Sequence, residues 1–194
     1  MENAGRGVVD VMQQLGIQGP VLIACGKGNN AGDGFVIARH LDLRDFEVNV
    51  ICFAEPSSLR GDAQANYQLL QHTRAFVHHF EQSEWSALRN SIPPPDWAVD
   101  ALLGTGVQGS PRPPYDLAID WLNSLDANRL AVDLPSGLDA ESGAVAPTTF
   151  RADHTCTFVA AKPGLVHPQA KEFVGQLRAL DIGAPRRLLD RFGV

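Results

Sequence analysis

The sequence has 194 residues, 44% of them hydrophobic and 20% charged, which is an ordinary composition for a globular protein. A chain of this length suffices for one well-packed core but is short for two, so we expect a single domain over residues 1–194. The formal net charge of −6 argues against a nucleic-acid-binding surface. No apolar run approaches the ~20 residues that a membrane-spanning helix needs, so neither nucleic acid nor a membrane is an expected partner.

The three cysteines, Cys25, Cys52 and Cys156, fall in apolar, strand-like runs and form no CxxC spacing. An odd number of cysteines at such positions is typical of buried thiols in a reducing compartment, rather than of disulfides or a zinc site. The N-terminus also lacks the charged-then-apolar pattern of a signal peptide. These features predict a cytoplasmic protein.

A helical pattern at the N-terminus begins a regular alternation of helices and strands. Apolar residues at Val8, Val9, Met12 and Leu15 predict a helix with one buried face over residues 2–16. The elements expected next are a strand over 20–25, a helix beginning near Gly32, a strand over 47–54 and a helix over 59–72. They are followed by a strand over 75–80, a short helix over 85–92, a strand over 97–103, a helix over 115–125 and a strand over 129–134. This order is typical of a doubly wound, three-layer α/β/α fold around a mainly parallel sheet.

The C-terminal part of the chain departs from this alternation. Two strand-like runs, over residues 154–161 and 176–182, are separated by only a brief connection. Parallel strands need a longer crossover, so we expect an antiparallel strand at the edge of the sheet near the C-terminus.

The first expected strand runs into a glycine-bearing loop. The pattern Gly26-x-Gly28-x-x-Ala31, after a strand and before a helix, matches the dinucleotide-binding fingerprint in its looser form. Glycine lets a ligand approach the backbone, and the helix N-terminus offers unpaired N–H donors to an anion. Such turns also occur for packing alone, so the pattern by itself leaves a purely structural interpretation open.

Polar residues at the tip of this loop narrow the interpretation. The amides of Asn29 and Asn30 can bond sugar hydroxyls or coordinate a cation through their oxygens. A carboxylate at Asp33, in the first helical turn, suits the helix dipole but repels a pyrophosphate beside it. Glu55 lies beyond the ~20-residue interval at which a dehydrogenase of this type places its acidic residue. The loop therefore indicates a nucleotide site with a ribose contact or a metal ion, and weighs against an ordinary dehydrogenase.

Two later strands also end in acidic, glycine-bearing turns. Asp100 is followed by Gly104-Thr105-Gly106, and Asp133 by Pro135-Ser136-Gly137. Either aspartate alone is commonly a cap for the following turn or helix. Because the carboxyl ends of parallel strands meet at one edge of the sheet, we expect both aspartates in one cleft with the first loop. Close carboxylates need a cation, a shared proton or hydrogen-bond donors.

A lysine, Lys162, ends a further apolar strand before Pro163 and Gly164. It can reach over the cleft edge to an acid or a phosphate, or it can be a solvated strand end. The six histidines form no ligand spacing, and His78 and His79 alternate across an expected strand, so they cannot both face one site.

Five segments, taken in order along the chain, resemble the YjeF N-terminal domain family, the NAD(P)H-hydrate epimerases. They are MENAG (1–5), GKGNNAGDGFVIARHL (26–41), DALLGTG (100–106), DLPSGLDAESG (133–143) and FVAAKPGL (158–165). The resemblance implies a Rossmann-like fold and a metabolite-repair activity. Members of the family interconvert the R and S epimers of NADHX and NADPHX, in which C6 of the nicotinamide ring is hydrated. The S epimer is then the substrate of an ADP- or ATP-dependent NAD(P)HX dehydratase.

The resemblance also implies the residues of the site. Positions that bind the hydrated dinucleotide fall on Asn29, Asn30, Ala31, Gly32, Asp33, Gly104, Thr105, Gly106, Val107, Gln108, Gly109, Ser110 and Asp133. Positions for one potassium ion (K+) per subunit fall on Asn30, Asp100 and Ser136, whose amide, carboxylate and hydroxyl oxygens suit an alkali cation. Asp133 and Lys162 are the expected catalytic residues. Asp133 would transfer protons as C6 passes through an iminium, while Lys162 balances charge and holds phosphate or ring. Ring opening at the same carbon is the alternative mechanism.

The chain departs from the family pattern at three points. Relatives usually carry a further helix, often in oligomer contacts, before the segment matching residues 1–5, which leaves a homodimer open. The commoner Asn-Asn-Gly-Gly is here Asn-Asn-Ala-Gly, and the methyl group of Ala31 would crowd a ligand if this position needs positive φ. The dehydratase domain fused to some relatives has no counterpart here, so we expect a stand-alone epimerase or an excised half. Two alternatives remain: a non-catalytic nucleotide- or RNA-binding scaffold module of the same fold, and a nicotinamide-dependent dehydrogenase or reductase.

Overall fold

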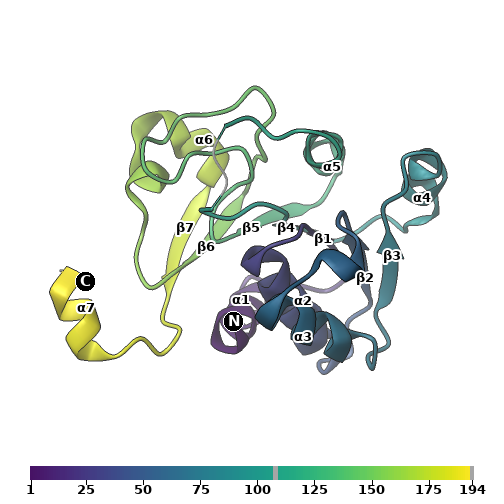
Figure 1. Ribbon diagram of the computed structural model, residues 1–194, viewed down its shortest axis with the longest axis horizontal. Coiled ribbons are helices and arrows are strands. Elements are labelled where there is room, and N and C mark those ends of the chain that lie inside the picture. The colour runs from purple at the N-terminus through teal and green to yellow at the C-terminus, as the bar shows by residue number, and fades with distance from the viewer. Residues whose placement is uncertain (107–108, 193–194) are drawn as a thin grey trace.

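Seven parallel strands form the centre of the protein. The computed structural model describes residues 1–106 and 109–192. The strands are β1 (Val21–Cys25), β2 (Val48–Cys52), β3 (Phe76–His79), β4 (Trp97–Ala101), β5 (Asn128–Val132), β6 (His154–Phe158) and β7 (Gln176–Leu180). They lie in the order β3-β2-β1-β4-β5-β6-β7, and every neighbouring pair is parallel (Figure 1). The α/β, Rossmann-like fold expected from the sequence is confirmed.

Helices cover both faces of this sheet. They are α1 (Glu2–Gln14), α2 (Asn29–Asp42), α3 (Gly61–Leu70), α4 (Trp85–Ser91), α5 (Tyr115–Ser124) and α6 (Lys171–Val174), whereas α7 (Arg186–Phe192) lies away from the sheet (Figure 1). The first five were expected from their apolar periodicity, whereas the short α6 and α7 were not. Among the described residues, no helix combines the length and the apolar character needed to cross a bilayer.

The expectation of an antiparallel edge strand was wrong. β7 pairs with β6 in parallel, from His154 opposite Gln176 to Phe158 opposite Leu180. The connection is longer than the sequence pattern indicated, because β6 ends at Phe158 rather than at residue 161. The connection contains two 3₁₀ helices (Pro163–Val166 and Pro168–Ala170) and α6. It returns the chain to the edge of the sheet where the parallel strands begin. Such a crossover is what a parallel pair requires.

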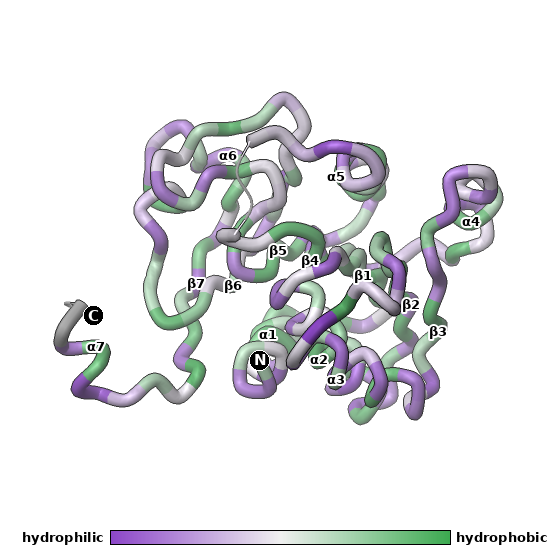
Figure 2. The backbone as a smooth tube through the Cα atoms, in the orientation of Figure 1, coloured by the Kyte–Doolittle hydropathy of each residue, from purple (hydrophilic) through white to green (hydrophobic). Residues whose placement is uncertain are grey.

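Alternate residues of each central strand feed two hydrophobic clusters, one on each face. Ile23 and Cys25 pack with α1 and α2, whereas Leu22 and Ala24 pack with Trp85 of α4 and Trp121 of α5. Hydrophobic residues accordingly follow the central strands in Figure 2. The three cysteines are free and buried, as predicted.

The helix after the first loop begins earlier than expected, at Asn29 rather than near Gly32. Gly28 precedes it with extended backbone (φ −92°, ψ −159°), so the chain enters the helix at once. Glycines bring this helix and loop against the sheet. A Cβ on Gly34 would lie 2.8 Å from Ala101 Cβ, and a Cβ on Gly26 would lie 2.0 Å from the Leu102 carbonyl oxygen. The two asparagines therefore sit in the first helical turn, close to the end of β4.

The order of the strands reverses between β1 and β4. The chain leaves β1 for α2 on one face of the sheet and leaves β4 for α5 on the other. Loops that diverge in this way open a crevice at the carboxyl ends of the strands, which is where ligands of such folds bind.

Candidate active site at the carboxyl edge of the sheet

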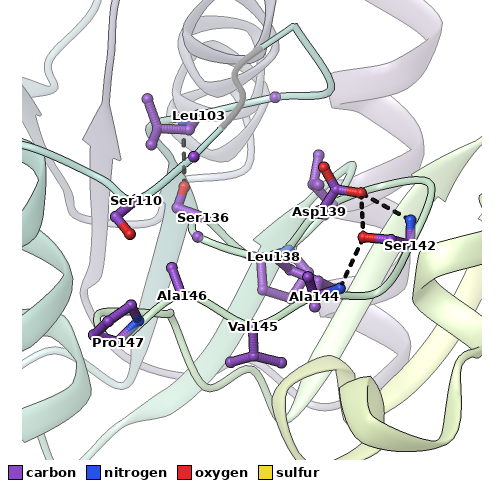
Figure 3. Close-up of a pocket in the computed structure, with 15 residues that line it drawn as sticks. Leu103, Ser110, Ser136, Leu138, Asp139, Ser142, Ala144, Val145, Ala146 and Pro147 are labelled. Carbon is purple, nitrogen blue, oxygen red and sulfur yellow. Dashed lines mark hydrogen bonds between the residues drawn. The ribbon is translucent and has the colours of Figure 1, made fainter.

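A buried aspartate ties the ends of β4 and β5 together. Asp100, the penultimate residue of β4, is 0% exposed. Its carboxylate accepts hydrogen bonds from the Ser136 N–H (2.7 Å), the Ser136 hydroxyl (2.7 Å) and the Leu102 N–H (3.1 Å). The Ser136 hydroxyl in turn accepts from the Leu103 N–H at 3.0 Å (Figure 3). Burial raises the pKa of Asp100 to about 6, although the bonds from Ser136 and Leu102 oppose this rise.

Asn30 brings the first loop into the same cluster. Its Nδ2 donates to the Leu103 carbonyl oxygen at 3.1 Å, so Asn30 and Ser136 both bond the backbone of Leu103. Its Oδ1 is buried and has no hydrogen-bond partner among the described residues. The three residues expected to hold a cation, Asn30, Asp100 and Ser136, are therefore gathered at one place. Among them, only Asn30 carries a buried side-chain oxygen, Oδ1, that accepts no hydrogen bond from a described residue.

A second cluster follows β5 and β6. Asp133 directly after β5 has a φ of 69°, which turns the chain sharply at the strand end. Its carboxylate forms an ion pair with Lys162 and accepts a hydrogen bond from the Thr157 hydroxyl at 3.2 Å. Lys162 also donates to the Thr157 hydroxyl (2.6 Å) and to the Phe158 carbonyl oxygen (3.3 Å). The side chains of Asp133 and Lys162 are 16% and 21% exposed, so Lys162 is mostly buried in this pair and is not a solvated strand end.

A third carboxyl group follows the first loop. Asp33, in α2, is 8% exposed, and its carboxyl group has no hydrogen bond or ion pair with any residue that the structure describes. Burial raises its pKa to about 7; the positive charge of the Met1 amine lowers it, and the negative charge of Asp133 raises it further.

A pocket of about 300 Å³ opens between the loop after β4 and the loop after β5 (Figure 3). Residues of the second loop that line it are Leu134, Pro135, Ser136, Gly137, Leu138, Asp139, Ser142, Ala144, Val145, Ala146 and Pro147. Leu138 and Val145 form an isolated antiparallel bridge, and Asp139 accepts from Glu141 N–H, Ser142 N–H and the Ser142 hydroxyl. Residues 137–147 were not predicted from the sequence to belong to the site. The Asp139-x-x-Ser142 turn was the signal that could have found this segment.

The predicted dinucleotide-binding residues occupy different surroundings. Gly104, Gly109 and Ser110 line the pocket, whereas Thr105 and Gly106 are exposed beside it; Val107 and Gln108 lie outside the described residues. Asn29, the first residue of α2, is exposed.

Ala31 and Gly32, in contrast to Asn29, are buried. Ala31 packs in the hydrophobic core within α2 and does not have a positive φ, so its methyl group does not crowd the cleft. Gly32 packs against Met1 and Ala63. Contacts of these two residues with a ligand would have to go through their backbone.

Comparison with known proteins relates this arrangement to one family. The sequence pattern described as "YjeF-related protein N-terminus" matches residues 1–164. The chain belongs to this family. NAD(P)H-hydrate epimerase from Pirellula staleyi is 42% identical over 191 residues, covering 98% of this chain and 84% of the relative. NAD(P)H-hydrate epimerase from Rhodopirellula baltica is 40% identical over 194 residues, covering 100% of this chain and 78% of the relative.

Other members of the YjeF-related family are longer. The bifunctional NAD(P)H-hydrate repair enzyme of Leishmania infantum is 41% identical over 97% of this chain, which spans 34% of that relative. The crystal structure of yeast ynu0 has a TM-score of 0.82, covering 100% of this chain and 82% of that chain at 22% sequence identity. At this identity the likeness concerns the fold alone.

The family resemblance expected from the motifs is confirmed by the match over residues 1–164 and by the two relatives at 42% and 40% identity.

Proposed function

We propose that this protein is an NAD(P)H-hydrate epimerase, an isomerase that interconverts the R and S epimers of NADHX and NADPHX. Two relatives with that name match nearly the whole chain at 42% and 40% identity. The observation that carries the proposal is the Asp133–Lys162 ion pair at the carboxyl edge of the sheet, on the same edge as the Asn30–Asp100–Ser136 cluster. A proton-transfer group at the edge of a dinucleotide-binding crevice is what epimerisation of a hydrated nicotinamide ring requires.

The chemistry of the substrate defines what the protein must do. The C6 hydroxyl group neighbours the ring nitrogen, so its departure as water leaves an iminium that water can attack from either face. Asp133 is the group that transfers a proton to the departing oxygen or takes one from the entering water. Lys162 holds the Asp133 carboxylate in place, and with Thr157 it fixes the direction in which the carboxylate points. The backbone N–H groups at the start of α2 are available for the phosphates.

The chain also offers ligands for one potassium ion per subunit. The unpartnered Asn30 Oδ1, the Asp100 carboxylate and the Ser136 hydroxyl would hold it, and all three are oxygens of the kind that hard cations prefer. A bound cation would supply positive charge beside the buried Asp100 carboxylate and the anionic substrate. A buried carboxylate without such a charge is costly, which agrees with the raised pKa of Asp100.

The partners follow from the same proposal. NADHX and NADPHX are the substrates, and an ADP- or ATP-dependent NAD(P)HX dehydratase consumes the S epimer. Relatives named as bifunctional repair enzymes support this pairing, because this chain matches only about a third of their length. We propose a single domain over residues 1–194, a homodimer as the assembly to test and the cytoplasm as the location, the last supported by three free, buried cysteines.

The test is to follow R-NADPHX by NMR or chiral chromatography with the protein, in potassium and in tetramethylammonium buffers. We expect fast approach to the R/S equilibrium, loss of at least about a hundredfold in rate for Asp133→Asn, and a rate close to wild type for the matched control Asp120→Asn, which is exposed on α5. Folded wild-type protein that gives only the spontaneous rate would contradict the proposal. Heat protection by RNA but not by NADPHX would then favour the scaffold alternative.

A further inference from the structure

The pocket between the loops after β4 and β5 has a lining whose charge the proton transfer described above does not explain. Its volume is about 300 Å³, and most of its lining is apolar, including Leu103 from the first loop and Leu134 and Leu138 from the second (Figure 3). Among the described residues that line it, only Asp139 carries a charge, and none is lysine, arginine or histidine. An apolar pocket with a few fixed polar groups suits a flat base and its sugar better than it suits a phosphate.

The two oxygens of the Asp139 carboxylate differ in their surroundings. Oδ1 accepts from the Ser142 hydroxyl at 2.7 Å and from the Ser142 N–H at 2.8 Å (Figure 3). It also accepts from the Glu141 N–H at 3.2 Å. Oδ2 has no hydrogen-bond partner among the described residues. The bonds from Ser142 hold the pKa of Asp139 below its usual value, so the carboxylate is anionic at neutral pH and keeps one oxygen for a ligand.

The chain around Asp139 is fixed by its own backbone. The Asp139 N–H donates to the Ala144 carbonyl oxygen at 2.9 Å, and the Gly143 N–H donates to the Asp139 carbonyl oxygen at 3.0 Å. Leu138 and Val145, on either side of this turn, form the isolated antiparallel bridge. Gly143 has a φ of 70°, which a glycine adopts without strain. The carboxylate therefore belongs to a preformed wall of the pocket.

The lining of the pocket also indicates which end of a dinucleotide it can take. Neither Asp133 nor Lys162 lines the pocket, so a reacting ring that contacts this pair lies outside it. The pocket is then left for the other end of the substrate, the adenosine. It adjoins the backbone proposed above for the phosphates, because Leu103 and Ser136 line it and Asn30, near the start of α2, bonds Leu103.

We propose that Asp139 determines specificity: its Oδ2 accepts a hydrogen bond from the 2′-hydroxyl group of the adenosine ribose, and the enzyme therefore prefers NADHX to NADPHX. The inference rests on the proposed function. The two substrates differ only at this hydroxyl group, which carries a phosphate in NADPHX. A carboxylate bonds a hydroxyl group but repels a phosphate, and no cation in the described lining offsets the repulsion. An acidic residue selects NAD in dehydrogenases for the same reason, although there it follows the second strand, where this chain has the exposed Glu55 outside the pocket.

The test compares kcat and KM for R-NADHX and R-NADPHX at one ionic strength. The proteins are wild type, Asp139→Asn and the matched controls Glu141→Gln and Glu55→Gln, which remove exposed carboxylates outside the pocket lining. Asparagine keeps an oxygen for the three bonds that hold the turn and replaces the charged Oδ2 by an amide nitrogen, which cannot accept a hydrogen bond.

Opposite changes of the two KM values are the expected signature. Wild type should prefer NADHX in kcat/KM by about fivefold or more. In Asp139→Asn, the KM for NADPHX should fall and that for NADHX should rise, with each kcat within about twofold of wild type, so that the preference shrinks at least about threefold. Both controls should keep the wild-type preference.

Several outcomes would overturn the inference. They include a smaller wild-type preference, an unchanged preference in Asp139→Asn, and equal losses with both substrates in that variant, which would make Asp139 a structural residue. The same shift in Glu141→Gln would indicate a general effect of charge, and a shift in Glu55→Gln alone would place the ribose at the end of β2. Wild type that epimerises neither substrate would instead defeat the proposed function itself, so the two failures are distinguishable.

Discussion

Replacing Ser136 by alanine removes one oxygen atom that joins two strand ends. The hydroxyl donates to the buried Asp100 carboxylate at 2.7 Å and accepts from the Leu103 N–H at 3.0 Å. Loss of a hydrogen bond to a charged group costs about 1.5–3 kcal/mol, and an unpaired, part-buried N–H costs about 1 kcal/mol more. Asp100 keeps its bonds from the N–H groups of Ser136 and Leu102, so the loss stays partial. We therefore expect Ser136→Ala to lower the free energy of unfolding by about 2–4 kcal/mol.

Urea unfolding of the two proteins, followed by circular dichroism in a buffer without potassium, measures this difference. The matched control is Ser91→Ala at the exposed end of α4, where the hydroxyl bonds only the carbonyl oxygen of Leu88 within the same helix. We expect the control to change stability by about 0.5 kcal/mol or less. For a chain of this size the difference corresponds to a fall of roughly 5–15 °C in Tm for Ser136→Ala. A loss no greater than that of the control would refute the view that Ser136 holds the ends of β4 and β5 together.

Three further predictions concern the first loop and the cleft. Gly26→Ala should cost about 3 kcal/mol or more, because its Cβ would lie 2.0 Å from the Leu102 carbonyl oxygen; an unchanged urea midpoint would contradict this packing. Gly28→Ala has no described atom within 4 Å of its Cβ, so stability should fall by about 1 kcal/mol or less while the KM for NADPHX rises; an unchanged KM would show that the ligand does not approach this backbone. Because the folded-state pKa of Asp33 is raised from 3.8 to about 7, ionisation costs the wild type stability as pH rises from 4 to 7. Asp33→Asn should match wild type near pH 4 and exceed it at pH 8 by up to about 4 kcal/mol, as read from urea midpoints across this range.

Most elements of the fold could be predicted from local patterns. Short apolar runs such as residues 20–25 and amphipathic periodicity such as that of residues 2–16 carry their own information, because strands buried on both faces and helices buried on one face have different periods. The helix start at Asn29 and the direction of β7 could not be predicted in this way. The first depends on the extended backbone at Gly28, and the second on how residues 159–175 fold back across the sheet.

Some parts of the candidate site could likewise be predicted from local sequence patterns, and other parts could not. Asp100, Asp133 and the asparagines were found because polar residues at strand ends stand out against apolar runs, and the family motifs assigned their chemistry. The pocket wall over residues 137–147 carries mostly small and apolar side chains, so apart from the Asp139-x-x-Ser142 turn no local pattern separated it from an ordinary loop. The partners of Lys162 were equally open, since a lysine at a strand end has the same sequence pattern whether it is solvated or paired.

The sequence by itself determined the α/β class, the crevice at the strand ends and the residue types available for binding and proton transfer. Tertiary structure alone decided which of these residues meet: Asn30 with Ser136 at the backbone of Leu103, and Lys162 with Asp133. The physical reason is that hydrophobic periodicity reports the burial of a residue on its own element. Hydrogen-bond partners, burial of charge and shifted pKa values depend on elements that are far apart in the chain and are brought together only by the order of the strands.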